Sequence, residues 1–133
     1  AVIGIERRHG GRLGAAVLDL ATGRTMAHRG EERFPLTSTF KLPLAGAVLA
    51  RVEAGQESLD RRIAFGREAL VTWSPVTEGA AGGPGLTVGA LAEACMTISD
   101  NTAANLLLEA VGGPAAFTAL ATRNPAWTAT RLS

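Results

Sequence analysis

The hydrophobic pattern of this chain changes once, and that change limits the folds open to it. Leu13 to Leu20 is rich in apolar and β-branched residues and lies between Gly10-Gly11 and Thr22-Gly23, so it is predicted to be a strand with Arg24 to His28 as its hairpin partner. From Ser38 onward the apolar period becomes helical. Because two paired strands are too few to form a stable sheet alone, we expect that another element completes the sheet.

The helical part begins with one stripe of apolar residues: Phe40, Leu44, Val48 and Val52. This helix is predicted to end at Gly55. Three further helices are predicted at Thr87 to Ile98, Asp100 to Val111 and Pro114 to Arg123. Thr87 is the expected N-cap of the first, and Asn124-Pro125 is expected to break the last. The predicted order is therefore an N-terminal helix, a hairpin and a run of helices.

Length, charge and hydropathy exclude several classes of protein. The 133 residues fit one domain, and 13 basic against 12 acidic residues give no basic field for nucleic acid or an anionic membrane. Among the basic residues, only Lys41 is a lysine. The longest apolar run, Leu42 to Ala50, is less than half of the roughly 20 residues that a membrane helix needs. No signal-peptide pattern occurs at the N-terminus, so we expect any such segment to have been removed or never present.

The sulfur-containing and histidine side chains are expected to be structural. Cys95 has no cysteine partner and is expected to be a small core residue on a helix, and Met26 and Met96 are expected to fill gaps in the core. His9 and His28 lie outside every motif and lack Cys, His or carboxylate companions at ligand spacing. The sequence therefore predicts no metal site and no cofactor.

Ser38 and Lys41 are three residues apart at the start of a predicted helix, so their side chains are expected to project from one face. A serine hydroxyl needs a base to become a nucleophile, and a lysine can act as that base when burial favours its neutral form. Free N–H groups at a helix N-terminus also stabilise an oxyanion. The same pair could instead be an N-cap serine followed by a solvated lysine. The spacing alone leaves both interpretations open.

Ser99-Asp100-Asn101 lies between two predicted helices, where a short turn can direct polar side chains into a cleft. It could also be a capping turn for the second helix, and the two roles can coexist. Ser-x-x-Lys followed by Ser-Asp-Asn is the beginning of the motif set of class A β-lactamases and penicillin-binding proteins.

With both motifs in order, the chain resembles the N-terminal half of a class A serine β-lactamase. The similarity extends over Glu32 to Pro35, Ala47 to Arg51, Leu59 to Ile63, Trp73 to Glu78, Leu86 to Val88, Ser99 to Leu108 and Gly112 to Pro114. It implies an α/β (α+β) fold of the serine β-lactamase and penicillin-binding-protein type, in which a helical region is inserted between two parts of an antiparallel sheet. Residues 1–36 would be the N-terminal helix and hairpin, and residues 37–133 would be the helical region.

The resemblance also implies catalytic roles for Ser38, Lys41 and Ser99 and a substrate-binding role for Asn101. Ser38 would open the β-lactam ring to form an acyl-enzyme, and its own backbone N–H would be half of the oxyanion hole. Lys41 would be the base or a proton relay. Ser99 would pass a proton to the departing ring nitrogen. Asn101 would hydrogen-bond Lys41 and the amide carbonyl of the substrate side chain.

Two further residues, Trp73 and Asp100, receive a binding and a structural role. Trp73 matches the aromatic residue at the family's cleft entrance, where an indole can pack on the bound drug. Ordinary core packing is the other interpretation of Trp73. Asp100 would hold the turn by accepting backbone hydrogen bonds.

The chain departs from the family pattern at three places. Thr37 stands where some members carry a cysteine, and Cys95 has no other cysteine to pair with in this sequence. The disulfide found in those members is therefore not expected here. Pro43 removes an early helix N–H and would kink the helix unless it lies in the first turn. Thr130-Arg131-Leu132 resembles the approach to the omega loop, and Ser133 is the last residue of the sequence.

The implied activity is hydrolysis of β-lactam antibiotics through acylation of Ser38, with the β-lactam as the partner molecule. The omega-loop glutamate, the Lys-Thr-Gly strand and the second oxyanion N–H would belong to a C-terminal half. We therefore expect the isolated chain to be inactive, or at most acylated without turnover. Otherwise we expect a monomer, located in the periplasm or secreted.

Two other functions stay open. A penicillin-binding DD-peptidase or penicillin sensor of the same superfamily would be acylated and would deacylate poorly, and a glutamate in the omega loop would decide against it. A truncated or split fragment could instead act as a complementation partner or a non-catalytic binding fragment.

Overall fold

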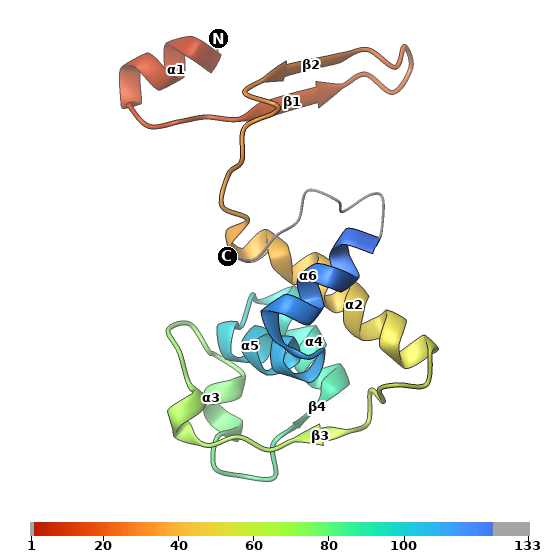
Figure 1. Cartoon of the computed structure of the whole chain (residues 1–133). Helices are drawn as coiled ribbons and strands as arrows, with labels where there is room; N and C mark the ends of the chain where they lie inside the picture. The colour runs from red at the N-terminus through yellow and green to blue at the C-terminus, as the bar shows by residue number, and fades with distance from the viewer. Residues whose placement is uncertain (1, 124–133) are drawn as a thin grey trace. The chain divides into compact units, whose positions relative to one another are not determined.

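The computed structural model describes residues 2–123 and divides into two compact units, unit 1 (residues 1–35) and unit 2 (residues 36–133). The sequence predicts a boundary after residue 36. Unit 1 contains α1 (Val2–His9), β1 (Ala15–Leu18) and β2 (Thr25–His28) (Figure 1). Unit 2 contains η1 (Thr37–Phe40), α2 (Lys41–Glu53), β3 (Arg62–Ile63), η2 (Arg67–Ala69), α3 (Thr77–Ala80), β4 (Leu86–Thr87), α4 (Val88–Thr97), α5 (Asn101–Ala110) and α6 (Gly113–Arg123). The predicted end of α6 at Asn124-Pro125 and the approach to the omega loop at residues 130–132 lie outside the described residues.

The predicted hairpin of unit 1 is confirmed. Strands β1 and β2 pair antiparallel, with Ala15 opposite His28 and Leu18 opposite Thr25. The turn between them is closed by Asp19, whose carboxylate accepts hydrogen bonds from the backbone N–H of Ala21 at 2.9 Å and from the hydroxyl of Thr22 at 2.6 Å. This Asx-type turn is the local chemistry that a tight hairpin needs.

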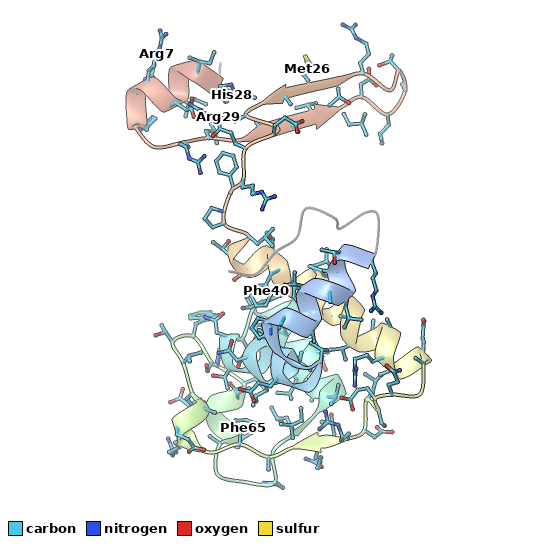
Figure 2. All side chains as sticks on the ribbon, viewed as in Figure 1. Arg7, Met26, His28, Arg29, Phe40 and Phe65 are labelled. Atoms are coloured by element: carbon cyan, nitrogen blue, oxygen red, sulfur yellow. The ribbon has the colours of Figure 1, made fainter. Side chains whose placement is uncertain are left out.

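Glu6 ties α1 to the end of the hairpin. Its carboxylate accepts hydrogen bonds from Arg29 Nε at 2.8 Å and from the backbone N–H of Leu13 at 2.7 Å, and it lies 3.1 Å from Nε2 of His28 (Figure 2 labels His28 and Arg29). The hydrogen bond from Arg29, then that from Leu13, then that from His28 lower the pKa of Glu6 to about 2. One carboxylate therefore joins three segments of unit 1.

Unit 2 is built on α2, α4, α5 and α6, which pack around one core (Figure 1). Each helix contributes a fully buried side chain: Leu44 of α2, Leu91 of α4, Leu107 of α5 and Phe117 of α6. Burying one such side chain stabilises a fold by about 1.5–3 kcal/mol, which is why these helices associate. The stripe predicted on α2 faces this core, since Leu44 and Val48 are both fully buried.

Local capping sets where α4 and α5 begin. The hydroxyl of Thr87 accepts a hydrogen bond from Ala90 N–H at 3.1 Å, as predicted for an N-cap. The carboxylate of Asp100 accepts one from Ala103 N–H at 2.9 Å. The predicted helices therefore start one residue after their caps.

The start of α2 differs from the sequence prediction. Residues Thr37–Phe40 form the 3₁₀ helix η1, and α2 begins at Lys41. Neither helix uses a side chain as its N-cap. Pro43 is the third residue of α2, where its missing N–H has no intrahelical partner to lose, so the proline lies in the first turn. Gly55, with φ of 67°, follows the end of α2 as predicted.

A second, two-stranded sheet was not predicted. Strand β3 pairs antiparallel with β4, with Ile63 opposite Leu86. Gly85 precedes β4 with φ of 75°, and a Cβ there would collide with the carbonyl of Ile63. Only glycine fits this close approach. The small sheet closes one side of unit 2 and leads directly into α4.

Three sulfur-containing residues test the predicted core. Cys95 is buried on α4, as predicted, and burial raises the pKa of its thiol. The predictions for Met26 and Met96 are wrong, because their side chains are 70% and 44% exposed (Figure 2 labels Met26 on β2). Both therefore lie on exposed faces of their elements. Sequence composition alone does not distinguish these faces from the packed ones.

The structure also shows whether any helix is long enough to span a membrane. Among residues 2–123, no single helix is long and apolar enough to cross a membrane, and only α5 and α6 together, bent by 79°, reach that length and composition.

Two leucines on α2 give a matched test of the core. Leu44 is fully buried and Leu42 is 63% exposed. Leu44→Ala is expected to lower the free energy of unfolding by about 2–5 kcal/mol, because it removes apolar contacts and leaves a cavity. Leu42→Ala is expected to change it by less than about 0.5 kcal/mol. Urea denaturation followed by circular dichroism measures both. Equal effects would contradict the packing described for α2.

The Glu6 contacts predict a pH dependence for unit 1. Because the pKa of Glu6 is lowered, the stabilisation from its carboxylate is complete above about pH 4.5 and is lost as the pH falls towards 2. The amide proton of Leu13 bonds this carboxylate, so its NMR chemical shift should titrate with a midpoint near 2. Glu6→Gln should abolish that titration. A midpoint near the ordinary glutamate value would contradict the hydrogen bonds assigned to Glu6.

Candidate active site

The turn between α4 and α5 brings polar groups to the centre of unit 2. Helix α4 ends at Thr97, and Ser99 adopts φ of 60°, in the left-handed region where glycine is usual. This conformation lets the N–H of Asp100 donate to the carbonyl of Ala94 at 3.2 Å before α5 starts at Asn101. Ser99 and Asn101 are thereby fixed on either side of a buried carboxylate.

That carboxylate, Asp100, holds the turn to the start of α3. It is fully buried and accepts hydrogen bonds from Val76 N–H at 3.0 Å, from Thr77 N–H at 3.0 Å and from the Thr77 hydroxyl at 2.9 Å, besides the helix cap at Ala103. Burial opposes ionisation, but the hydrogen bonds from Ala103, Thr77 and Val76 outweigh it, so the pKa of Asp100 is lowered. An ionised carboxylate thus joins two loops.

Lys41 lies at the first position of α2 and is buried, with 3% exposure. Its Nζ donates to Ser99 O at 2.6 Å, to Ser99 Oγ at 2.8 Å and to Asn101 Oδ1 at 2.6 Å. A lysine ammonium has three donors, and all three are used. The three acceptors are uncharged oxygens of one turn. The solvated-lysine interpretation is therefore wrong.

Ser38 is connected to Lys41 through Ser99. The hydroxyl of Ser99 donates to Ser38 Oγ at 3.1 Å and accepts from Lys41 Nζ at 2.8 Å. Ser38 itself is exposed on η1, and the N-cap positions of η1 and α2 are Leu36 and Phe40. The N-cap interpretation of Ser38 is therefore wrong as well. The arrangement gives an accessible hydroxyl at the end of a two-step proton path.

Asn101 has a defined amide orientation. Its Nδ2 donates to the carbonyl of Thr72 at 2.8 Å, so the opposite atom, Oδ1, faces Lys41. The backbone N–H of Asn101 donates to the carbonyl of Trp73 at 3.0 Å. Two consecutive carbonyls of one loop therefore hold this residue.

Trp73 is 63% exposed, so core packing is not its role. Its indole Nε1 donates to the carbonyl of Ile98 at 2.9 Å, and its backbone has φ of 64°. The side chain is anchored at its polar edge and presents its ring to solvent, a geometry suited to packing on a ligand.

The structure brings the five residues predicted for the site into one network. Lys41 contacts Ser99 and Asn101, Ser99 contacts Ser38, and Asn101 contacts Trp73 through the backbone. Beside this network is a pocket of about 370 Å³, lined by Phe40, Lys41, Val71, Thr72, Asn101, Ala104 and Asn105.

Sequence reasoning missed the two other polar residues that line this pocket, Thr72 and Asn105. Asn105 lies one helical turn after Asn101, a spacing that places both on one face of α5 and could have identified it. Thr72 contributes through its carbonyl, which side-chain motifs do not encode. Within the described part of the chain, no group of three or more His, Cys, Asp or Glu side chains is placed to hold a metal ion.

Proteins of known structure are similar to this chain in sequence and fold. A family model described as the beta-lactamase enzyme family matches residues 1–133. A class A β-lactamase of the last common ancestor of Gram-negative bacteria is 61% identical, with a TM-score of 0.88 over 99% of this chain and 50% of its own. A β-lactamase from Desulfarculus baarsii is 52% identical, with a TM-score of 0.83 over 92% of this chain and 45% of its own.

This chain therefore spans about half the length of these structures. The predicted serine β-lactamase fold, a helical region with the first two antiparallel strands of the sheet, is confirmed by the family match and by these similarities. The chain belongs to the β-lactamase enzyme family, and its fold is that of the class A enzymes.

Proposed function

We propose that this chain is the nucleophile-bearing half of a class A β-lactamase, in which β-lactam antibiotics acylate Ser38. The observation that carries the proposal is the hydrogen-bond path from Lys41 Nζ through Ser99 Oγ to Ser38 Oγ, with lengths of 2.8 and 3.1 Å. An accessible serine linked to a buried lysine by a second hydroxyl is the arrangement that serine acylation needs. Family membership supports the β-lactam as the substrate class.

During acylation, protons move along this hydrogen-bond path first towards Lys41 and then back from it. The step starts after the Lys41 ammonium has released one proton to solvent, so that the Ser38 hydroxyl donates to Ser99 and the Ser99 hydroxyl donates to the neutral Nζ. As Ser38 Oγ bonds the β-lactam carbonyl carbon, its proton passes to Ser99 and the Ser99 proton passes to Lys41. When the ring C–N bond breaks, Ser99 gives a proton to the departing nitrogen and recovers one from Lys41. The net change moves the Ser38 proton to the ring nitrogen.

Asn101 and Trp73 orient the substrate in this proposal. One hydrogen of Asn101 Nδ2 is used by the Thr72 carbonyl, which leaves the second to donate to the amide carbonyl of the substrate side chain. The exposed indole of Trp73 packs on the bound drug. The backbone N–H of Ser38 supplies one donor to the oxyanion.

A penicillin-binding peptidase or sensor would use the same acylation chemistry. The two functions differ in hydrolysis of the acyl-enzyme, which requires a base that activates water. We assign that base, the Lys-Thr-Gly strand and the second oxyanion donor to the rest of the fold, because the chain spans about half of its structural relatives. Turnover is therefore expected only when that part is supplied.

The nucleophile is tested by intact-mass spectrometry after addition of a penicillin. The protein used is residues 1–133 joined in one chain to the remaining half of a structurally similar class A enzyme, called the completed protein below. In samples quenched with acid during the reaction, before the acyl-enzyme is hydrolysed, its mass should rise by that of one penicillin. Ser38→Ala should abolish the rise, whereas Ser58→Ala, which removes another exposed serine hydroxyl, should not. A rise that survives Ser38→Ala would refute the site.

Turnover is tested with a chromogenic cephalosporin. The completed protein should hydrolyse it, and the isolated chain should give at most a stable acyl-enzyme, because deacylation needs groups outside the active-site network described above. Equal hydrolysis by the isolated chain would refute the need for the other half. A completed protein that is acylated without turnover would indicate a penicillin-binding enzyme instead.

A further inference from the structure

We infer that Thr102 and Ser74 are positioning residues, whose hydroxyls close a hydrogen-bonded ring that sets Asn101 and Trp73 for reaction with the substrate. The kinetic part of this inference rests on the proposed function. The geometric part concerns the loop Val71 to Ser74, called the clamp loop below, and can be tested without any substrate.

The ring consists of two hydroxyls and the two backbone groups of Val71. The N–H of Val71 donates to Thr102 Oγ1 at 3.0 Å. Thr102 Oγ1 lies 2.7 Å from Ser74 Oγ, and Ser74 Oγ donates to the carbonyl of Val71 at 2.7 Å. Thr102 is fully buried and Ser74 is 9% exposed, so water does not compete for these groups.

Counting protons sets the direction of the ring. Each hydroxyl has one proton, and that of Ser74 is used on the Val71 carbonyl. The Thr102 proton then points to Ser74 Oγ at 2.7 Å, in preference to the Ala69 carbonyl at 3.3 Å. Each of the three residues of the ring, Val71, Thr102 and Ser74, donates once and accepts once. Such a satisfied network in a buried site is rigid.

The ring spans a strained turn. Trp73 lies between Val71 and Ser74 and has φ of 64°, a left-handed conformation that costs a non-glycine residue about 1–3 kcal/mol. Such a conformation persists only when surrounding contacts determine it. Fixing both backbone groups of Val71 and the side chain of Ser74 supplies contacts at each end of the turn.

The clamp loop in turn fixes Asn101. The Thr72 carbonyl accepts from Asn101 Nδ2 at 2.8 Å, and the Trp73 carbonyl accepts from Asn101 N–H at 3.0 Å. The orientation of Asn101 Oδ1 towards Lys41 depends on the first of these bonds. Consecutive residues of α5 thus have complementary tasks: Thr102 holds the loop, and the loop holds Asn101.

Only a positioning role for Thr102, and not a packing role, requires a hydroxyl group at this residue. Valine has nearly the volume of threonine and would fill the buried site, so a purely packing role would tolerate Thr102→Val without an effect on the reaction. Removing the hydroxyl leaves Val71 N–H without its acceptor and frees the loop. Thr102→Ser restores the oxygen and removes only a methyl group.

The experiment compares Thr102→Val, Thr102→Ser and Ser74→Ala with a matched control, Thr122→Val. Thr122 is exposed on α6, and its hydroxyl donates to Thr118 O of the same helix at 2.9 Å. All variants are first compared by melting temperature and then assayed well below it. The first readout is the rate at which a penicillin acylates Ser38 in the completed protein. The second is the fluorescence anisotropy of Trp73 in residues 1–133 alone. That chain carries Trp127→Phe, so Trp73 is its only tryptophan.

Thr102→Val should be acylated about tenfold to hundredfold more slowly, because a small displacement of a positioning group has effects of this size. The Trp73 anisotropy of Thr102→Val should also fall. Ser74→Ala should change both readouts in the same direction as Thr102→Val. Thr102→Ser and Thr122→Val should retain the parent values of both. Acylation of Thr102→Val at the parent rate, or an equal loss in Thr102→Ser, would overturn the inference. If the parent itself is not acylated, the proposed function fails, and the anisotropy readout still decides whether the ring holds Trp73.

Discussion

The buried ammonium group of Lys41 is the interaction on which the rest of unit 2 depends. Taking a charge out of water is costly unless every donor finds an acceptor. The three acceptors come from Ser99 and Asn101, which are 58 and 60 residues away in the sequence. Helix α2 and the turn between α4 and α5 must therefore pack in one register. The apolar core of Leu44, Leu91 and Leu107 holds that register.

Backbone strain is concentrated beside these polar groups. In unit 2, the described non-glycine residues with positive φ are Thr37, Trp73 and Ser99, at 47°, 64° and 60°. Each adjoins or belongs to the network of Ser38, Lys41 and Asn101. The ionised Asp100 offsets this strain, because its hydrogen bonds hold both the turn and the start of α3. The site is thus rigid because polar contacts oppose the strain.

Local signals predicted much of this fold. The caps Thr87 and Asp100 and the apolar stripe of α2 are encoded within a few residues, so the starts of α4 and α5 agreed with the sequence to within one residue. Non-local features could not be predicted in this way. The pairing of β3 with β4, the burial of Lys41 and the exposure of Trp73 depend on segments far apart in the chain. The motifs identified which residues form the site. The hydroxyl and backbone carbonyl groups that connect these residues could be identified only in the structure.

The burial of Lys41 can be measured directly, because it is the only lysine of the chain. Labelling lysine with ¹⁵N gives a single side-chain signal in the NMR spectrum. If three oxygens hold the ammonium, its hydrogens should exchange with water more slowly than those of free lysine, and Asn101→Ala should accelerate the exchange. Exchange as fast as in free lysine, with no effect of Asn101→Ala, would contradict the account of this site.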